Sequence, residues 1–558
     1  MPKVWQIFGR GNRQLSLDVR DQPPRIVEPP EEIEGVLDTY RIPAGARSDA
    51  SAEVFVVEED GVGRYLVRLP KLSVEEGKAL ELLRANLIDS IPAQADGEAQ
   101  DVVANYMWKT AEGSGLAPLL ERSHQKLLYY LMKEFAGFWE VDTLMNDDNL
   151  EEISVVRYDR PVRVVHRNFS EYMFMETDVV YSSEERLQAF VRRLAQFGGT
   201  TVSFAQPSLE VTLHGASDKR VTATLGDEIS RPGSTYAIRK QRERPITLAQ
   251  LASPELARWP APEPKASSET SSYEEDHSHK TLSVLMAAYF WLLLERTTNV
   301  LIAGETNSGK TTLMNAILAL ANPKYKVVTA EDVLEINLPD HLHWQRLKTR
   351  AYRAGLSPIA GRYEYGLPEL LKLALRLSPT ILSLGEMRGE ESETVAAAIT
   401  LGFSTMTTIH AEDAGRCVKR LTTPPMRFSA GQIRDITAIV TMRKVVLQDG
   451  QVVRRVVSVD ELKPIGNDGH EIVNVFRYDP AADSFSPTTA AEVLDRSFRL
   501  NEIAESYGWS PDVVQASLAA RAARISERIA GGDPTPQALS TMVREFAEEE
   551  SGRRRHNR

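Results

Sequence analysis

A phosphate-binding loop is the feature that most restricts how this chain can fold. Residues 304–311 read Gly-Glu-Thr-Asn-Ser-Gly-Lys-Thr, which has the spacing of glycines, lysine and hydroxyl residue that such a loop requires. An apolar run at 299–303 precedes the loop, and a helix-forming run follows it from Thr312. Because a strand before the loop and a helix after it are the context in which the motif binds phosphate, we expect a nucleotide site here.

The chemistry of the loop assigns roles to its residues. Two glycines let the backbone bend so that successive N–H groups point at a phosphate, and the following helix adds its positive N-terminal end. Lys310 would reach the β- and γ-phosphates, and the Thr311 hydroxyl would hold Mg²⁺. The expected nucleotide contacts are Gly304, Glu305, Thr306, Asn307, Ser308, Gly309, Lys310, Thr311 and Thr312.

Apolar runs alternate with helical segments in this part of the chain. The runs are 299–303, 326–330, 381–384 and 404–409. This alternation predicts an α/β fold with a mostly parallel sheet, in which ligands bind beyond the carboxyl ends of the strands.

Polar side chains follow three of these runs. Glu331, Asp332 and Glu335 come after the second run, Glu386 comes after the third, and His410 ends the fourth. A carboxylate at a strand end is by itself more often a helix cap, and a single histidine is usually structural. Together, in this order, they supply the metal anchor, the water-orienting carboxylate and the polar sensor that phosphoryl transfer needs.

The regions before the loop predict further folded units. Apolar alternation around 54–69 predicts a hairpin, followed by a helix that begins after Ser73. Between 151 and 247 the pattern is strand, strand, helix and two strands, which indicates an α+β domain. Proline, serine, glutamate and histidine dominate 260–280, so we expect a linker there.

Composition and hydropathy exclude several classes of protein. A net charge of −12 argues against a nucleic-acid binder, and the single cysteine, Cys417, excludes an intramolecular disulfide. The apolar stretch 281–294 is shorter than the roughly twenty residues of a membrane span, so it predicts a buried helix. The apolar start of the chain is also too short for a signal peptide.

After the loop domain, the pattern predicts a strand at 471–477 and helices at 494–507 and 513–529. The charged segment 548–555 reads as a solvated tail.

At these motifs the chain resembles the hexameric secretion ATPases of type II and type IV systems. The resemblance is carried by the phosphate loop, by Glu331-Asp332 as the Asp box, and by 385–388 as an atypical Walker B segment with glycine in place of the usual aspartate. Residues 408–411 match the His box. Segments that look most like the archaeal branch are 149–154, 161–167 and 229–240.

The resemblance implies a RecA-like P-loop ATPase domain with a parallel-sheet core, preceded by an α+β N-terminal domain. The expected organisation is a flexible N-terminal arm at 1–35, an accessory domain at 36–125, an α+β lobe at 126–258, a linker at 259–280, the ATPase domain at 281–465 and a helical extension at 466–558.

The resemblance also implies an activity and a set of partners. ATP and Mg²⁺ would be the cofactors of a homo-hexameric motor that powers pilus-like or archaellum filament assembly, or protein secretion. The motor would be cytoplasmic and attached to the membrane through a polytopic inner-membrane platform protein, acting indirectly on pilin-like subunits. Glu331 or Glu386 would orient water, His410 would sense the γ-phosphate, and Thr311, Asp332 and Glu386 would serve the metal. Arginines of the N-terminal lobe would reach the phosphates, and Arg220, Arg231 and Arg239 lie on the matching stretch.

Two departures from the family pattern keep other functions open. Ser378-Pro379-Thr380 stands where the family usually has Arg-Pro-Asp, and Gly402-Phe403 stands where it usually has Gly-His. An ATP-binding ring component with weak or no turnover is therefore one alternative. A conjugation-type DNA-export ATPase is another, although the acidic composition disfavours it.

Overall fold

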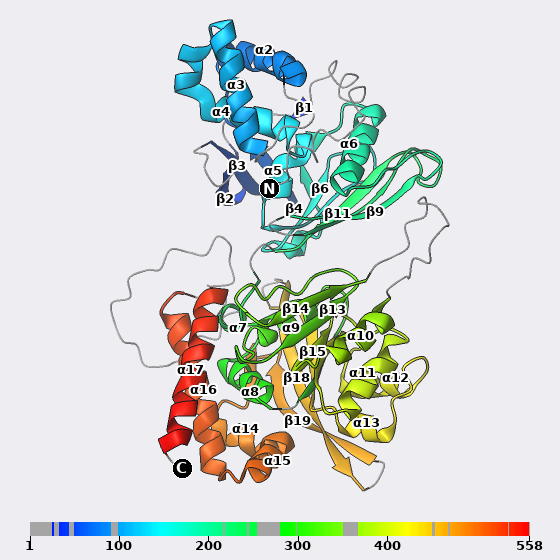
Figure 1. The fold of residues 1–558 in the computed structure, drawn as a ribbon, viewed down its shortest axis with the longest axis vertical. Coiled ribbons are helices and arrows are strands. Elements are labelled where there is room, and N and C mark those ends of the chain that lie inside the picture. Colours follow the sequence, from blue (N-terminus) through cyan, green and yellow to red (C-terminus); the bar gives the residue numbers. More distant parts are fainter. Residues whose placement is uncertain are drawn as a thin grey trace. The chain divides into compact units, whose positions relative to one another are not determined.

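A computed structural model shows two compact units, Met1–Glu243 and Arg244–Arg558 (Figure 1). The residues that it describes are 25–26, 33–43, 50–90, 99–215, 218–242, 245–253, 280–296, 298–349, 366–448, 452–466, 469–533 and 535–556. Most of the expected N-terminal arm and of the expected linker at 259–280 lies outside these residues. The first unit ends before the expected limit of the α+β lobe at 258, because the short helix beyond it packs in the second unit's core.

The first unit is built on one nine-stranded sheet. Its strands are β2 (Val36–Pro43), β3 (Ser51–Glu59), β4 (Val62–Arg68), β5 (Leu150–Val155), β6 (Arg163–His166), β7 (Met175–Thr177), β9 (Ser208–Leu213), β10 (Lys219–Thr224) and β11 (Thr235–Lys240). Its helices are α2 (Val74–Ser90), α3 (Ala99–Ser114), α4 (Ala117–Phe135), η1 (Trp139–Val141), α5 (Asp142–Asn146), η2 (Ser170–Tyr172) and α6 (Glu184–Phe197). The sheet order is β2-β3-β4-β7-β6-β5-β11-β10-β9, and β1 (Arg25–Ile26) pairs separately with β8 (Val179–Val180). Strands from the expected accessory region therefore share a sheet with those of the α+β lobe.

Local sequence explains this unit's elements. The expected hairpin is confirmed as β3 and β4, which pair antiparallel across the turn at 60–61. Ser73 accepts a hydrogen bond from the backbone N–H of Glu76, and the Glu76 carboxylate accepts one from the N–H of Ser73, so the two residues cap α2. Buried residues of α6 pack on one face of the sheet, while α2, α3 and α4 form a core of their own.

The second unit contains the phosphate loop and a second nine-stranded sheet. Its strands are β12 (Asn299–Gly304), β13 (Val327–Glu331), β14 (Trp344–Lys348), β15 (Ile381–Leu384), β16 (Ser404–Ile409), β17 (Ala438–Val446), β18 (Val452–Ile465), β19 (Gly469–Asp479) and β20 (Ser484–Ser486). The order is β14-β13-β15-β16-β12-β17-β18-β19-β20. All neighbours from β14 to β17 are parallel, and those from β17 to β20 are antiparallel. The four expected strands are confirmed, and their parallel order makes this a RecA-like α/β domain.

Helices cover both faces of this sheet (Figure 1). They are α7 (Leu248–Ala252), α8 (Val284–Leu294), α9 (Lys310–Leu318), α10 (Leu367–Arg376), α11 (Glu391–Thr400), α12 (Ala414–Thr422), α13 (Ala430–Arg434), α14 (Ala490–Arg496), α15 (Phe498–Tyr507), α16 (Pro511–Ala530) and α17 (Pro536–His556). Successive residues of β12 enter different cores: Val300 and Ile302 pack with α8 and α9, whereas Leu301 and Ala303 pack on the side of α10 to α13. Burial on both faces explains why this strand is apolar throughout rather than alternating.

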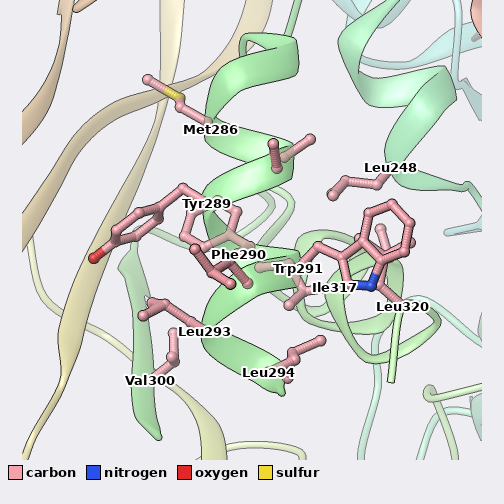
Figure 2. Close-up of a cluster of buried hydrophobic side chains, with 14 of the residues drawn as sticks. Leu248, Met286, Tyr289, Phe290, Trp291, Leu293, Leu294, Val300, Ile317 and Leu320 are labelled. Atoms are coloured by element: carbon pink, nitrogen blue, oxygen red, sulfur yellow. The ribbon is translucent and has the colours of Figure 1, made fainter. Parts of the chain in front are cut away.

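The expected buried helix is α8, whose side chains from Met286 to Leu294 are all at most 3% exposed. Figure 2 shows Tyr289 and Trp291 leaving this helix toward different sides of the core. Tyr289 donates a hydrogen bond to the buried Glu461 of β18, and Arg521 of α16 lies over the ring of Trp291. Within the described part of the chain, no helix combines the length and apolar character needed to cross a membrane.

The expected solvated tail is helical in its first half, where Glu548 and Glu549 are exposed as expected. Residues 548–550 belong to α17, where Glu549 binds Arg524 at 2.7 Å and Glu550 binds Arg521 at 3.3 Å. Glu549 and Glu550 also pair with arginines of α16. The side chains of 553–555 lie outside the described residues.

Candidate nucleotide-binding site

The phosphate loop lies between β12 and α9 and has the shape that its sequence predicts. A Cβ on Gly304 would lie 2.5 Å from the Met442 carbonyl oxygen, so only glycine fits there. Asn307 and Gly309 adopt positive φ angles of 60° and 94°, and α9 begins directly after Gly309. The loop therefore presents backbone N–H groups and a helix N-terminus, which together attract anions.

Lys310 is held within the loop. Its Nζ donates to the carbonyl oxygen of Glu305 at 2.6 Å, and the Ser308 hydroxyl donates to the same oxygen at 2.8 Å. Burial lowers the pKa of Lys310, while the charge of Glu386 opposes that shift. Thr306 is exposed, and Thr311 and Thr312 are half-buried in the first turn of α9.

Glu331, the last residue of β13, is the most enclosed carboxylate of the site, with 1% exposure. Its Oε1 accepts hydrogen bonds of 2.8 Å from the backbone N–H groups of Glu335 and Ile336. Its Oε2 is buried with no hydrogen-bond partner among the described residues, and Arg346 Nε lies 3.8 Å away. Burial raises the pKa of Glu331 to about 7, although the backbone hydrogen bonds and Arg346 oppose the rise. This carboxyl can therefore exchange a proton near neutral pH.

Gly385 stands directly against Glu331. A Cβ at position 385 would lie 3.4 Å from Cγ of Glu331. An aspartate there would bring a second carboxylate to the buried first one, and like charges at this distance resist ionisation. Glycine at position 385 therefore adds no carboxylate of its own beside Glu331.

Glu386 and His410 follow the neighbouring strands β15 and β16. Glu386 Oε2 accepts a hydrogen bond from Arg388, and its Oε1 lies 3.3 Å from His410 Nε2. Burial raises the pKa of Glu386, but Arg388, His410 and Lys310 together hold it below its usual value, so this group stays ionised. Burial, with help from the charge of Lys310, lowers the pKa of His410, which is therefore mainly neutral at pH 7.

Hydrogen bonds between β16 and the segment after β15 fix Glu386 and His410 relative to each other. The Thr408 hydroxyl donates to the Gly385 carbonyl oxygen at 2.8 Å, and the N–H of Met387 donates to the Thr408 carbonyl oxygen at 2.9 Å. The structure therefore brings Lys310, Glu386 and His410 to one edge of the sheet, beside Glu331.

The residues expected to serve the metal are less closely grouped. Asp332 and Glu335 are exposed, and Thr311 is on the helix side of the site. Among the described residues, no three or more histidine, cysteine or acidic side chains are arranged to hold a metal ion by themselves.

The three arginines expected to reach phosphate belong to the first unit, and all are exposed. Arg220 and Arg239 are cross-strand partners on β10 and β11, while Arg231 lies in the loop between these strands. Arg220 pairs with Glu210 at 3.5 Å and Arg239 with Glu152 at 3.3 Å.

Sequence reasoning missed two arginines that contact the site in the second unit. Arg346 comes from β14, a half-buried edge strand whose sequence shows no alternation of apolar and polar residues. Arg454 comes from β18, and its Nε donates to the Asn307 carbonyl oxygen of the loop at 3.1 Å. No motif spacing links either residue to the loop.

Comparison with known proteins identifies the family to which the chain is similar. Residues 277–471, which include the loop and all three polar strand ends, match the family described as "Type II/IV secretion system protein". Two uncharacterised proteins of Methanocaldococcus jannaschii are similar. MJ1287 is 35% identical over 43% of this chain and 86% of its own length, and MJ0900 is 30% identical over 73% of this chain and 66% of its own length.

A bacterial relative carries a functional name. The type IV secretion system protein VirB11 of Bartonella henselae is 26% identical over 50% of this chain and 78% of its own length. The archaeal relatives agree with the resemblance to the archaeal branch. By its motifs, its family match and these relatives, the chain belongs to the type II/IV secretion system ATPase family.

Proposed function

We propose that this chain is a motor that hydrolyses ATP to drive secretion or the assembly of a pilus-like or archaellum filament. One observation carries the proposal: the phosphate loop, Glu331, Glu386 and His410 all follow neighbouring parallel strands of one sheet. Membership of the secretion family supports the kind of work that hydrolysis would drive.

Binding would be the task of the loop. Its N–H groups and the N-terminus of α9 would hold the β-phosphate, and Lys310 would move its ammonium from the Glu305 carbonyl toward the β- and γ-phosphates.

Glu331 is the proposed water-orienting carboxylate. A group with a pKa of about 7 can accept a proton from water at neutral pH, whereas Arg388 and Lys310 help to hold the pKa of Glu386 below its usual value. As the water oxygen bonds to the γ-phosphorus, the bond to the β–γ bridging oxygen breaks, and the proton passes to Glu331. ADP and inorganic phosphate are the products. Glu386, His410 and Lys310 would respond together to loss of the γ-phosphate, because they already contact one another electrostatically.

The chain fits a magnesium ion as part of the bound nucleotide. Hydroxyl and carboxylate oxygens are the donors that Mg²⁺ prefers, and Glu386 Oε1 is a buried oxygen without a hydrogen-bond partner among the described residues. Thr311, Asp332 and Glu386 would hold the ion or its water shell, and the ion would neutralise charge on the phosphates.

The rest of the proposal follows the family resemblance. The active form would be a homo-hexamer, with Arg220, Arg231 and Arg239 supplying positive charge to the γ-phosphoryl group. The motor would act at the cytoplasmic face of the membrane on a polytopic platform protein, and through it on pilin-like subunits.

The test combines nucleotide hydrolysis with particle mass. Wild-type protein should release phosphate from ATP in the presence of Mg²⁺ and should form a six-membered particle with nucleotide. Lys310→Ala should lose turnover, since the variant lacks the charge that reaches the phosphates. Full hydrolysis by Lys310→Ala would refute the site assignment. A protein that binds ATP but releases no phosphate would instead be a regulatory ring component.

A further inference from the structure

We infer that Arg454 is a positioning residue that holds the phosphate loop in its binding shape. The inference rests on the proposed function, because it assumes that residues 304–312 bind a nucleotide. Arg454 is 147 residues from its partner in the loop, and it reaches the loop from β18, on the side away from Glu331 and Glu386.

Arg454 contacts the loop at two of its residues that have a positive φ angle. Its Nε donates to the carbonyl oxygen of Asn307, whose φ of 60° lies in the left-handed region that side chains other than glycine rarely adopt. Its Cδ lies 3.4 Å from the place where a Cβ on Gly309 would stand. One side chain therefore bonds the left-handed turn residue and packs over the glycine from which α9 starts.

The backbone of Arg454 is anchored by the residue that follows it. The next residue, Arg455, has a side chain only 1% exposed and forms a two-point ion pair with Asp483, at 2.9 and 3.0 Å. Arg455 also donates to the Arg454 carbonyl oxygen at 3.1 Å, and Tyr478 donates to Asp483 at 2.6 Å. The loop is thus tied through Arg454 to a buried ionic cluster on β18, β19 and the turn before β20.

The contact of Arg454 with Asn307 and Gly309, called the brace below, acts mainly before the nucleotide binds. Without a ligand, the loop must keep its N–H groups pointing inward, and a contact that stabilises this arrangement raises the fraction of competent molecules. Once phosphates are bound, they hold the loop themselves. Removing the brace should therefore weaken nucleotide binding and raise KM, while kcat changes little.

The decisive variant is Arg454→Met, which keeps the apolar stem over Gly309 and removes the donor to Asn307. The matched control is Lys444→Met, because Lys444 is the exposed cross-strand partner of Arg454 and carries the same charge. Loss of one hydrogen bond predicts binding of ADP about three- to tenfold weaker in Arg454→Met, with KM for ATP raised similarly and kcat within about twofold. In ligand-free protein, hydrogen exchange at residues 305–309 should be faster than in wild type. Lys444→Met should match wild type in all of these measurements.

Each contrary result has a distinct meaning. Unchanged loop exchange and unchanged ADP binding in Arg454→Met would overturn the brace while leaving the proposed function intact. Equal weakening by Lys444→Met would also overturn it, because the effect would then be one of general charge. Failure of wild-type protein to bind ADP at all would overturn the proposed function, and with it the assumption on which the brace depends.

Discussion

The buried carboxyl of Glu331 makes the sharpest prediction, through the change Glu331→Gln. Glutamine keeps an oxygen that can accept the hydrogen bonds from Glu335 and Ile336, so the loop that follows β13 should stay folded. The amide cannot accept a proton from water, however. Turnover should fall by about 10²- to 10⁴-fold, which is the usual contribution of a general base, while nucleotide binding is retained.

The structure also sets how the stability of the protein should respond to pH. Burial raises the pKa of Glu331 from 4.5 to about 7, which corresponds to about 3 kcal/mol against the ionised form. Because the folded-state pKa is the higher one, the stabilising contribution is fully present below pH 4.5 and is lost as pH rises through about 7. Glu331→Gln does not titrate. The free energy of unfolding of wild type minus that of the variant should therefore fall by about 2–3 kcal/mol between about pH 5 and pH 8.

Two assays test this reasoning. Calorimetric unfolding of both proteins across that pH range gives the difference in stability, and the pH profile of kcat/KM reports the same proton in the free enzyme. Dividing the wild-type profile by that of Glu331→Gln removes the titration of ATP itself. Glu386→Gln is the control, because its effect on stability should depend on pH in the opposite direction. The pKa of Glu386 is lowered, so the stabilising contribution of this carboxylate is present at neutral pH and lost on acidification. A stability difference that does not change with pH, or a variant that hydrolyses ATP at the wild-type rate, would refute the role given to Glu331.

Two further predictions come from particular contacts. Gly385→Asp should place a second carboxylate beside Glu331, so the midpoint of the pH profile of kcat/KM should move to higher pH. An unchanged midpoint would show that a carboxylate at position 385 does not raise the pKa of Glu331. Arg521→Met should destabilise the second unit by about 3–5 kcal/mol in thermal unfolding, since Arg521 is fully buried and its loss leaves Glu295, which is 11% exposed, without this ion pair. Arg524→Met removes an exposed pair with Glu549 and should cost less than about 1 kcal/mol, and equal costs for the two arginines would contradict the argument from burial.

Local patterns were sufficient for much of the second unit. The four apolar runs became β12, β13, β15 and β16 because a parallel strand buried on both faces must be apolar throughout. Polar residues directly after such strands necessarily meet at one edge of the sheet. The phosphate loop, Glu386 and His410 could therefore be placed together from their order in the sequence alone.

Features that depend on pairing between distant segments could not be predicted in this way. β14 is an edge strand without apolar alternation, so neither the strand nor Arg346 has a local signal. Arg454 reaches the loop only because β18 folds back on β17, which in turn pairs with β12. The pairing of Glu549 and Glu550 has no local signal either, because their partners, Arg524 and Arg521, lie on another helix.

The raised pKa of Glu331 could not be predicted from the sequence either. An acid after a strand gives no measure of its burial, and only the folded chain shows that Ile336, Arg346 and Gly385 surround this carboxyl. By sequence alone, Glu331 and Glu386 are equal candidates for the carboxylate that orients water, and the proposal favours Glu331 because of its burial and raised pKa.

The most direct test of the whole account is the number of phosphate ions that one chain releases from excess ATP with Mg²⁺. Wild-type protein should turn over repeatedly and release many phosphates per chain, and Glu331→Gln should lose nearly all of that turnover. Release of no more than one phosphate per chain by the wild-type protein, under conditions in which it binds ATP, would contradict the claim that this site drives a motor.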